Sequence, residues 1–129
     1  MFKVQAVFSG FSVNDLAEAK QFYAEILGLA VANEEMGLQL KLPEGGTLFI
    51  YPKDDHQPAT FTVLNFVVEN IDNAVDELTN KGVSFERYSD MPMKPDEKGI
   101  LRGLAANQGP DIAWFKDPAG NILSVLQDK

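Results

Sequence analysis

Few side chains in this sequence belong to the types that carry out chemistry. The only histidine is His56, which stands in the triplet Asp54-Asp55-His56, and there is no cysteine. Imidazole and carboxylate groups together could bind a metal ion. A histidine in a charged connecting stretch is more simply interpreted as a solvated side chain. The lack of cysteine excludes disulfides, thiolate catalysis and any zinc site that contains cysteine.

Nucleophilic catalysis and nucleotide binding find little support in the sequence. A serine nucleophile needs a histidine base within hydrogen-bond reach. His56 is distant in the chain from every serine, namely Ser9, Ser12, Ser84, Ser89 and Ser124. The pair Gly45-Gly46 is too short for a phosphate-binding loop and is typical of a hairpin turn. The glutamates Glu34, Glu35 and Glu44 lie near turns and are expected to be solvated charges.

Two segments have the apolar spacing of three and four residues that predicts an amphipathic helix. The first runs from about 15 to 27, with Asn14 placed to cap its start and Gly28 placed to end it in the left-handed conformation. The second runs from about 71 to 81 and ends at Gly82.

The chain is an internal repeat of one pattern. A β-like run precedes each helix, at residues 4–13 and 61–68, and Phe11 falls on Phe66 when the two halves are overlaid. Three further strands should follow each helix. We expect them at 30–35, 38–42 and 47–51 in the first half, and at 84–88, 112–115 and 122–126 in the second. A repeat of one strand, one helix and further strands indicates the architecture of the whole chain. We predict one α+β domain over 1–129, with repeat one at about 4–52 and repeat two at about 61–126.

One segment breaks this symmetry. Residues 89–110 show no clean period, yet they include Met91 and Met93 among several apolar side chains. Loops of this length inside a compact domain usually serve function or are mobile. Flexible methionines can repack around different ligands. The segment is therefore predicted to be either a mobile lid or a fixed plug over the binding site.

Charge and hydropathy limit the classes of partner. The chain has 19 acidic and 11 basic side chains, a formal net charge of −8. Such a surface repels a phosphate backbone and attracts cations, although it also simply keeps a protein soluble, so no nucleic-acid partner is expected. No apolar run is long enough to cross a membrane, and the N-terminal stretch is too short and interrupted for a signal peptide. We expect a cytoplasmic protein without a membrane partner.

Three stretches in register resemble the vicinal oxygen chelate superfamily of glyoxalases, bleomycin-resistance proteins and dioxygenases. Val13-Asn14-Asp15-Leu16, then Phe22-Tyr23 and Leu27-Gly28-Leu29, is similar to its opening strand, acidic turn and helix. Residues 66–72 are similar to the start of its second repeat. Residues 115–121, which contain Asp-Pro-Ala-Gly-Asn, are similar to its closing turn. Together they span almost the whole chain.

The resemblance implies two βαβββ modules that form a U-shaped, mostly antiparallel sheet. The helices would lie on the convex side, and the concave side would be a cup that holds the site. Side chains alternate between the faces of a strand, so Val7, Phe11 and Val13 are expected to face the helices. The side chains expected in the cup and at a ligand are Phe8, Phe49, Tyr51, Val63, Asn65, Trp114 and Ser124. The apolar members suit core packing as well as a ligand, whereas Asn65 needs hydrogen-bond partners wherever it lies.

Metal-dependent members of the family have histidine or glutamate in the first, fourth, fifth and last strands. The matching positions here are Phe8, a site near Phe49, Val63 and Ser124. None of these is a competent ligand for a divalent first-row metal, and Ser124 is at most a weak oxygen donor. We therefore predict no metal and no cofactor.

Two classes of function remain open. The first is a metal-free binding protein that sequesters a small apolar, aromatic or cationic ligand, as the resemblance to the bleomycin-resistance branch implies. The alternative is a divergent lyase, isomerase or dioxygenase-like enzyme that uses Asn65, Tyr51, Arg102 or Asp111. The resemblance also implies a homodimer, since paired modules often complete their cups with a partner chain, and an open apolar cup would otherwise expose a large patch.

Overall fold

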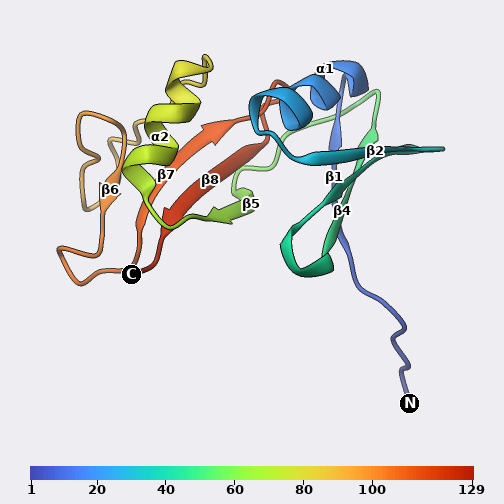
Figure 1. Ribbon diagram of the computed structural model, residues 1–129, viewed down its shortest axis with the longest axis horizontal. Coiled ribbons are helices and arrows are strands. Elements are labelled where there is room, and N and C mark those ends of the chain that lie inside the picture. The colour runs from blue at the N-terminus through green and yellow to red at the C-terminus, as the bar shows by residue number, and fades with distance from the viewer. The chain divides into compact units, whose positions relative to one another are not determined.

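The computed structural model describes residues 1–129. The chain divides at Pro58 into two compact units, residues 1–58 and 59–129, here called module 1 and module 2. Each module contains one helix-bearing βαβββ unit with its own four-stranded sheet (Figure 1). The α+β class and the duplicated module are therefore confirmed, while the joining of the two sheets into one cup stays a prediction. No helix is long and apolar enough to span a membrane.

Module 1 has four strands in the order β1-β4-β3-β2. Strand β1 runs parallel to β4, and the other two pairings are antiparallel. Its elements are β1 (Ser9–Val13), α1 (Leu16–Gln21), the π-helical turn η1 (Phe22–Ile26), β2 (Ala30–Glu34), β3 (Gly37–Lys41), the 3-10 turn η2 (Pro43–Gly45) and β4 (Thr47–Pro52).

The first helix begins one residue later than the sequence indicates. Asp15, and not Asn14, is the N-cap, because its carboxylate accepts a hydrogen bond of 3.0 Å from the backbone N–H of Glu18. The helix packs against β3 and β4. Tyr23 is fully buried there, with its ring 6.2 Å from that of Phe11. Gly28 then turns the chain with φ of +70°, as predicted.

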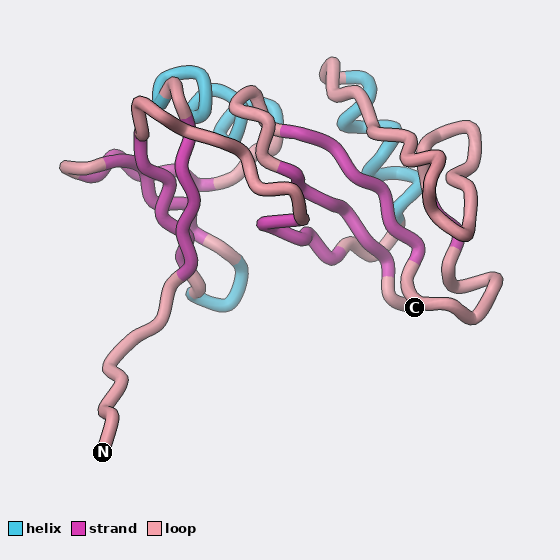
Figure 2. The backbone as a smooth tube through the Cα atoms, turned by 180° about the vertical axis from the view of Figure 1, so that it is seen from behind, coloured by secondary structure: helices cyan, strands magenta, loops and turns pink.

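Alternation along the strands separates two faces of the module 1 sheet. Phe11 and Val13 are buried toward the helix, as predicted. They share this core with Leu38, Leu40, Leu48 and Ile50. The expectation for Val7 is wrong, because its side chain is 86 % exposed. The strand begins only at Ser9, whose partner Leu48 is almost the first residue of β4, so the ladder has no partner for residues 1–7. Figure 2 shows this segment as a loop leading away from the sheet.

Module 2 repeats the arrangement with the order β5-β8-β7-β6. Strand β5 is parallel to β8, and the remaining pairs are antiparallel. Its elements are β5 (Thr62–Val67), α2 (Ile71–Asn80), β6 (Leu101–Arg102), β7 (Asp111–Lys116) and β8 (Ile122–Gln127). Asn70 caps α2 by accepting 3.0 Å from the N–H of Asn73, and Gly82 follows the helix with φ of +95°.

The sixth strand is not where the sequence indicates. Residues 84–88 form only an isolated bridge, between Phe85 and Phe115, while Leu101 and Arg102 form β6. The two short segments share one edge of β7, near its two ends. An alternating pattern shows that a segment suits a strand but not which part of an edge it will pair with.

Candidate functional site

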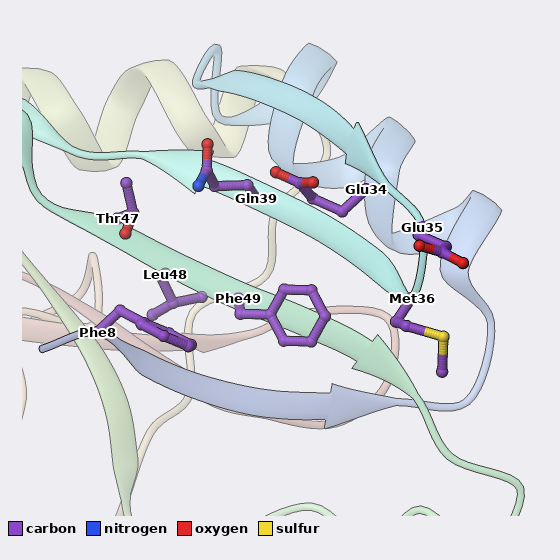
Figure 3. Close-up of a pocket in the computed structure, with 8 residues that line it drawn as sticks. All are labelled: Phe8, Glu34, Glu35, Met36, Gln39, Thr47, Leu48 and Phe49. Carbon is purple, nitrogen blue, oxygen red and sulfur yellow. The ribbon is translucent and has the colours of Figure 1, made fainter. Parts of the chain in front are cut away.

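A cavity lies on the open face of module 1, opposite the helix. It measures about 310 Å³, and Figure 3 shows the side chains around it. It is lined by Phe8, Glu34, Glu35, Met36, Gln39, Thr47, Leu48 and Phe49. Its size lies at the lower end of the range typical of small-molecule sites. Two of the predicted cup residues, Phe8 and Phe49, are thus brought together.

Aromatic rings form the floor of this face. Phe49 and Tyr51 stand two residues apart on β4, so they share a face, and their rings stack at 5.9 Å with an angle of 19°. Phe8 is 65 % exposed and lies beside Phe49 in the close-up (Figure 3). The edge of β1 next to Phe49 is occupied by Gly10, which has no side chain to fill the space.

The rim of the cavity is acidic. Glu34, Glu35 and Met36 come from the end of β2 and the turn into β3, and all three side chains are exposed. Two carboxylates beside aromatic rings and a polarisable thioether suit a cationic or aromatic group. The sequence predicts both glutamates to be solvated charges near a turn, and in the structure they also border the cavity. A turn at Met36-Gly37 follows from the sequence, but the cavity beside that turn does not.

The single histidine lies against a serine. His56 Nδ1 is 2.6 Å from Ser12 Oγ, and both side chains are partly buried. Ser12 follows Gly10 on the open face of β1, and its partner across the ladder is Tyr51. The expectation that no serine has a histidine partner is therefore wrong. The linker between the two repeats, residues 52–58, folds back onto β1, where the N–H of Lys53 donates to the carbonyl of Val13 at 2.9 Å.

Four of the predicted site residues, Val63, Asn65, Trp114 and Ser124, lie on the strands of module 2. Trp114 lies on β7 and donates from Nε1 to Thr62 Oγ1 at 3.1 Å, which supplies the partner that the indole requires. Tyr88 packs edge-on against Trp114, with ring centres 5.6 Å apart. Burial and the nearby charge of Glu86 raise the pKa of Tyr88, so its hydroxyl stays neutral.

Asn65 and Ser124 satisfy each other. Ser124 is fully buried on β8, and its hydroxyl donates to the side-chain oxygen of Asn65 on the neighbouring β5 at 2.5 Å. Val63 falls at a bulge between Thr62 and Leu64. Because of this bulge, Thr62 takes the ladder position next to Ile122. Its hydroxyl is the group that accepts the hydrogen bond from Trp114.

The side chains at the family's metal positions do not fit a metal ion. Phe8 and Phe49 present phenyl rings, Val63 is aliphatic, and the hydroxyl of Ser124 already donates to Asn65. No group of three or more histidine, cysteine, aspartate or glutamate side chains is placed to hold an ion. No chemistry at this site can therefore be derived through a metal bound by these residues.

Two other candidate catalytic residues serve the architecture of module 2. The guanidinium of Arg102 forms paired hydrogen bonds of 2.8 and 3.0 Å with Asp72 on α2, and its Nε donates to Asp96 at 3.0 Å. Asp111 is buried and accepts 3.0 Å from the N–H of Leu104. Lys98 adds contacts of 3.3 and 3.1 Å to Asp72 and Asp76. Lys98 and Arg102 thus hold their segment against α2, and the bond to Asp111 ties Leu104 to β7.

Comparison with known protein families shows to which superfamily the chain belongs. Residues 6–125 match the sequence profile of the Glyoxalase/Bleomycin resistance protein/Dioxygenase superfamily. The chain belongs to this superfamily. The resemblance found in its motifs is thereby confirmed. No curated protein matches the sequence significantly.

Solved structures share the fold at low identity. A member from Sphaerobacter thermophilus DSM 20745 has a TM-score of 0.67 at 22 % identity, with 97 % of this chain and 98 % of that chain covered. The antibiotic binding protein TnmS3 from Streptomyces sp. CB03234 has 0.63 at 20 %, covering 99 % and 100 %. The fosfomycin resistance protein FosX from Listeria monocytogenes has 0.68 at 15 %, covering 99 % and 96 %. Identities this low show a shared fold alone.

Proposed function

We propose that this protein binds a small aromatic or cationic compound on the open face of module 1, without a metal ion, in a sequestration or resistance-like role. The observation that carries the proposal is the cavity of about 310 Å³ whose floor is aromatic and whose rim holds Glu34 and Glu35. Aromatic faces attract cations through the ring quadrupole, and adjacent carboxylates add to that attraction.

The composition of the site supports binding more than metal-assisted catalysis. The positions that carry ligands in metal-dependent relatives hold Phe8, Phe49, Val63 and Ser124. Arg102, Asp111 and Asn65, three of the four residues considered for a divergent enzyme, are engaged in structural hydrogen bonds. One structural neighbour is an antibiotic binding protein and another a fosfomycin resistance protein, which is consistent with a ligand-binding role.

The direct test is a thermal-shift screen of metal-stripped protein against aromatic cations, neutral aromatics and aromatic anions. We expect aromatic cations to raise the melting temperature, with the same shift in the presence of a chelator. Phe49→Ala should weaken binding by roughly tenfold or more, since it removes a stacking surface worth about 1–3 kcal/mol. Glu34→Gln should weaken the binding of aromatic cations and leave the binding of neutral aromatic compounds unchanged.

Two matched variants serve as controls. Phe2→Ala removes an aromatic ring that is 90 % exposed and outside the cavity, and Glu25→Gln removes an exposed carboxylate on η1. Neither should change binding. A melting temperature that rises only with an added first-row metal would favour the enzyme class. Equal losses of binding in Phe2→Ala and Phe49→Ala would contradict binding at the cavity.

A further inference from the structure

The Ser12–His56 pair joins two segments that lie 44 residues apart, and its geometry is that of a nucleophile and its base. Ser12 Oγ and His56 Nδ1 are 2.6 Å apart, within the distance at which an imidazole can take a hydroxyl proton. In the tautomer that carries its proton on Nε2, Nδ1 accepts the hydrogen bond from the serine hydroxyl. Serine alone is a weak nucleophile and needs such a base.

The segment that carries His56 is held in place at several points. The N–H of Lys53 donates to the carbonyl of Val13 at 2.9 Å, and the N–H of His56 donates to the carbonyl of Lys53 at 3.1 Å. The ammonium of Lys53 pairs with Asp55 at 2.6 Å. The imidazole therefore belongs to a defined turn, and the carboxylates of Asp54 and Asp55 adjoin it in the chain.

The pair stands at the end of an aromatic surface. Ser12 lies opposite Tyr51 in the parallel ladder, and Gly10, two residues earlier on the same face, lies opposite Phe49. Gly10 adds no side chain between Phe8 and Ser12, and a Cβ at this position would lie 3.0 Å from the carbonyl oxygen of Phe49. An acyl or aryl group resting on the rings of Phe49 and Tyr51 would have its carbonyl carbon near the serine hydroxyl.

We propose that Ser12 and His56 form a serine–histidine acyl-transfer site, whose substrates are activated esters with an aromatic acyl or leaving group. Ser12 Oγ forms a bond to the ester carbonyl carbon while its proton passes to His56. The bond between that carbon and the leaving oxygen breaks, and the leaving oxygen takes the proton from the imidazolium. Water then attacks the acyl-serine with His56 again as base, which releases the carboxylic acid and restores the hydroxyl.

The test uses p-nitrophenyl acetate and p-nitrophenyl phenylacetate with the full-length protein. We expect a rapid release of nitrophenolate that is stoichiometric with the chain, and a preference for the phenylacetate. The tryptic peptide spanning 4–20 contains both Ser9 and Ser12, and its fragments should locate the acyl group on Ser12. Because Ser9 is exposed and only three residues away, it is an internal control for indiscriminate acylation.

Variants separate a chemical role from a structural one. Ser12→Ala should abolish the stoichiometric release, Ser9→Ala should leave it unchanged, and His56→Asn should slow acylation by roughly 10²-fold. The wild-type mapping stands even if a variant fails to fold. Equal acylation of Ser9 and Ser12, or a folded His56→Asn protein that acylates at the wild-type rate, would overturn the proposal and leave the pair as a tether for the linker.

Discussion

Asp72 on α2 forms salt bridges with both Arg102 and Lys98 in module 2. The hydrogen bond from Arg102 lowers the pKa of its carboxyl to about 2, with Lys98 adding to the effect and burial opposing it. The folded protein therefore favours the ionised carboxylate. The resulting stability is complete above the pKa of the unfolded chain, at about 4. It is lost as the pH falls toward the folded-state value.

Asp72→Asn should consequently lower the free energy of unfolding near neutral pH. The side chain is 44 % exposed, so solvent screens the pair and the expected loss is about 0.5–1 kcal/mol. Urea unfolding as a function of pH measures this directly. The difference from the wild type should shrink as the pH falls from about 4 toward 2. Asp76→Asn, which removes only the exposed contact to Lys98, should cost less, and an equal cost would contradict the assignment to Arg102.

Some site residues follow from strand alternation, and others depend on contacts that alternation does not describe. Strand alternation that turns Phe11 and Val13 toward the helix predicts Phe8 on the open face of β1. Phe49 was expected there because it matches the family's ligand position in the fourth strand. The pairing of Ser12 with His56 depends on how the linker folds back onto β1, and the sequence shows that linker only as charged and proline-bounded. A hydrogen bond across 44 residues leaves no local pattern to detect.

At the scale of secondary-structure elements, residues 89–110 divide into a first part, 89–95, and a second part that begins at Asp96. Arg87 donates to the backbone carbonyls of Asp96 and Glu97, and the carboxylate of Asp96 accepts from the N–H groups of Lys98 and Ile100 at 2.9 Å. Ile100 is fully buried. These bonds anchor the second part, so mobility of the kind predicted for a lid is left to residues 89–95.

Hydrogen exchange should divide the segment at the same place. We expect slow exchange at the amides of Ile100 and Leu104 and fast exchange across 89–95 in the empty protein. Arg102→Gln should accelerate the slow amides because it removes the clamp to Asp72, while Lys94→Gln, an exposed change in the same segment, should not. Fast exchange throughout 96–111 in the wild type would contradict the anchoring. Slow exchange across 89–95 that no ligand changes would rule out the lid.

The elements themselves were largely predictable, apart from the edge of the second sheet. Both helices have clear apolar periods and glycine ends, and the turn at 117–121 is held by Asp117, whose carboxylate accepts from two backbone N–H groups at 2.9 Å. The sixth strand could not be predicted because it contains only two residues, Leu101 and Arg102. Their position depends on the Arg102 contacts with α2, which are not local.

At the scale of the whole molecule, both modules leave large apolar side chains exposed. Val7 is 86 %, Phe61 67 % and Val67 63 % exposed, and β1 and β5 are edge strands of their sheets. Exposed apolar surface beside an unpaired edge is typical of an association surface. We therefore predict a homodimer, in which these side chains are covered.

Sedimentation velocity at micromolar concentration measures the assembly. The wild type should sediment as a dimer, and Phe61→Asp or Val67→Asp should shift it toward monomer by placing a charge in an apolar contact. Asn73→Asp adds the same charge to the exposed side of α2 and should leave the dimer intact. A monomeric wild type would contradict this prediction.

The four methionines offer the most direct measurement of ligand binding at the module 1 cavity. Met36 lines that cavity, Met91 and Met93 lie in residues 89–95 of module 2, and Met1 is fully exposed at the N-terminus. Carbon-13 labelling of the methionine methyl groups gives one NMR signal for each. The titration uses metal-stripped protein, a chelator and an aromatic cation from the thermal-shift screen. If the ligand binds at the cavity, the Met36 signal should shift in a saturable manner while the Met1 signal stays fixed. A Met36 signal that stays unchanged while other methyl signals move, or that shifts only after a metal is added, would contradict metal-free binding at this site.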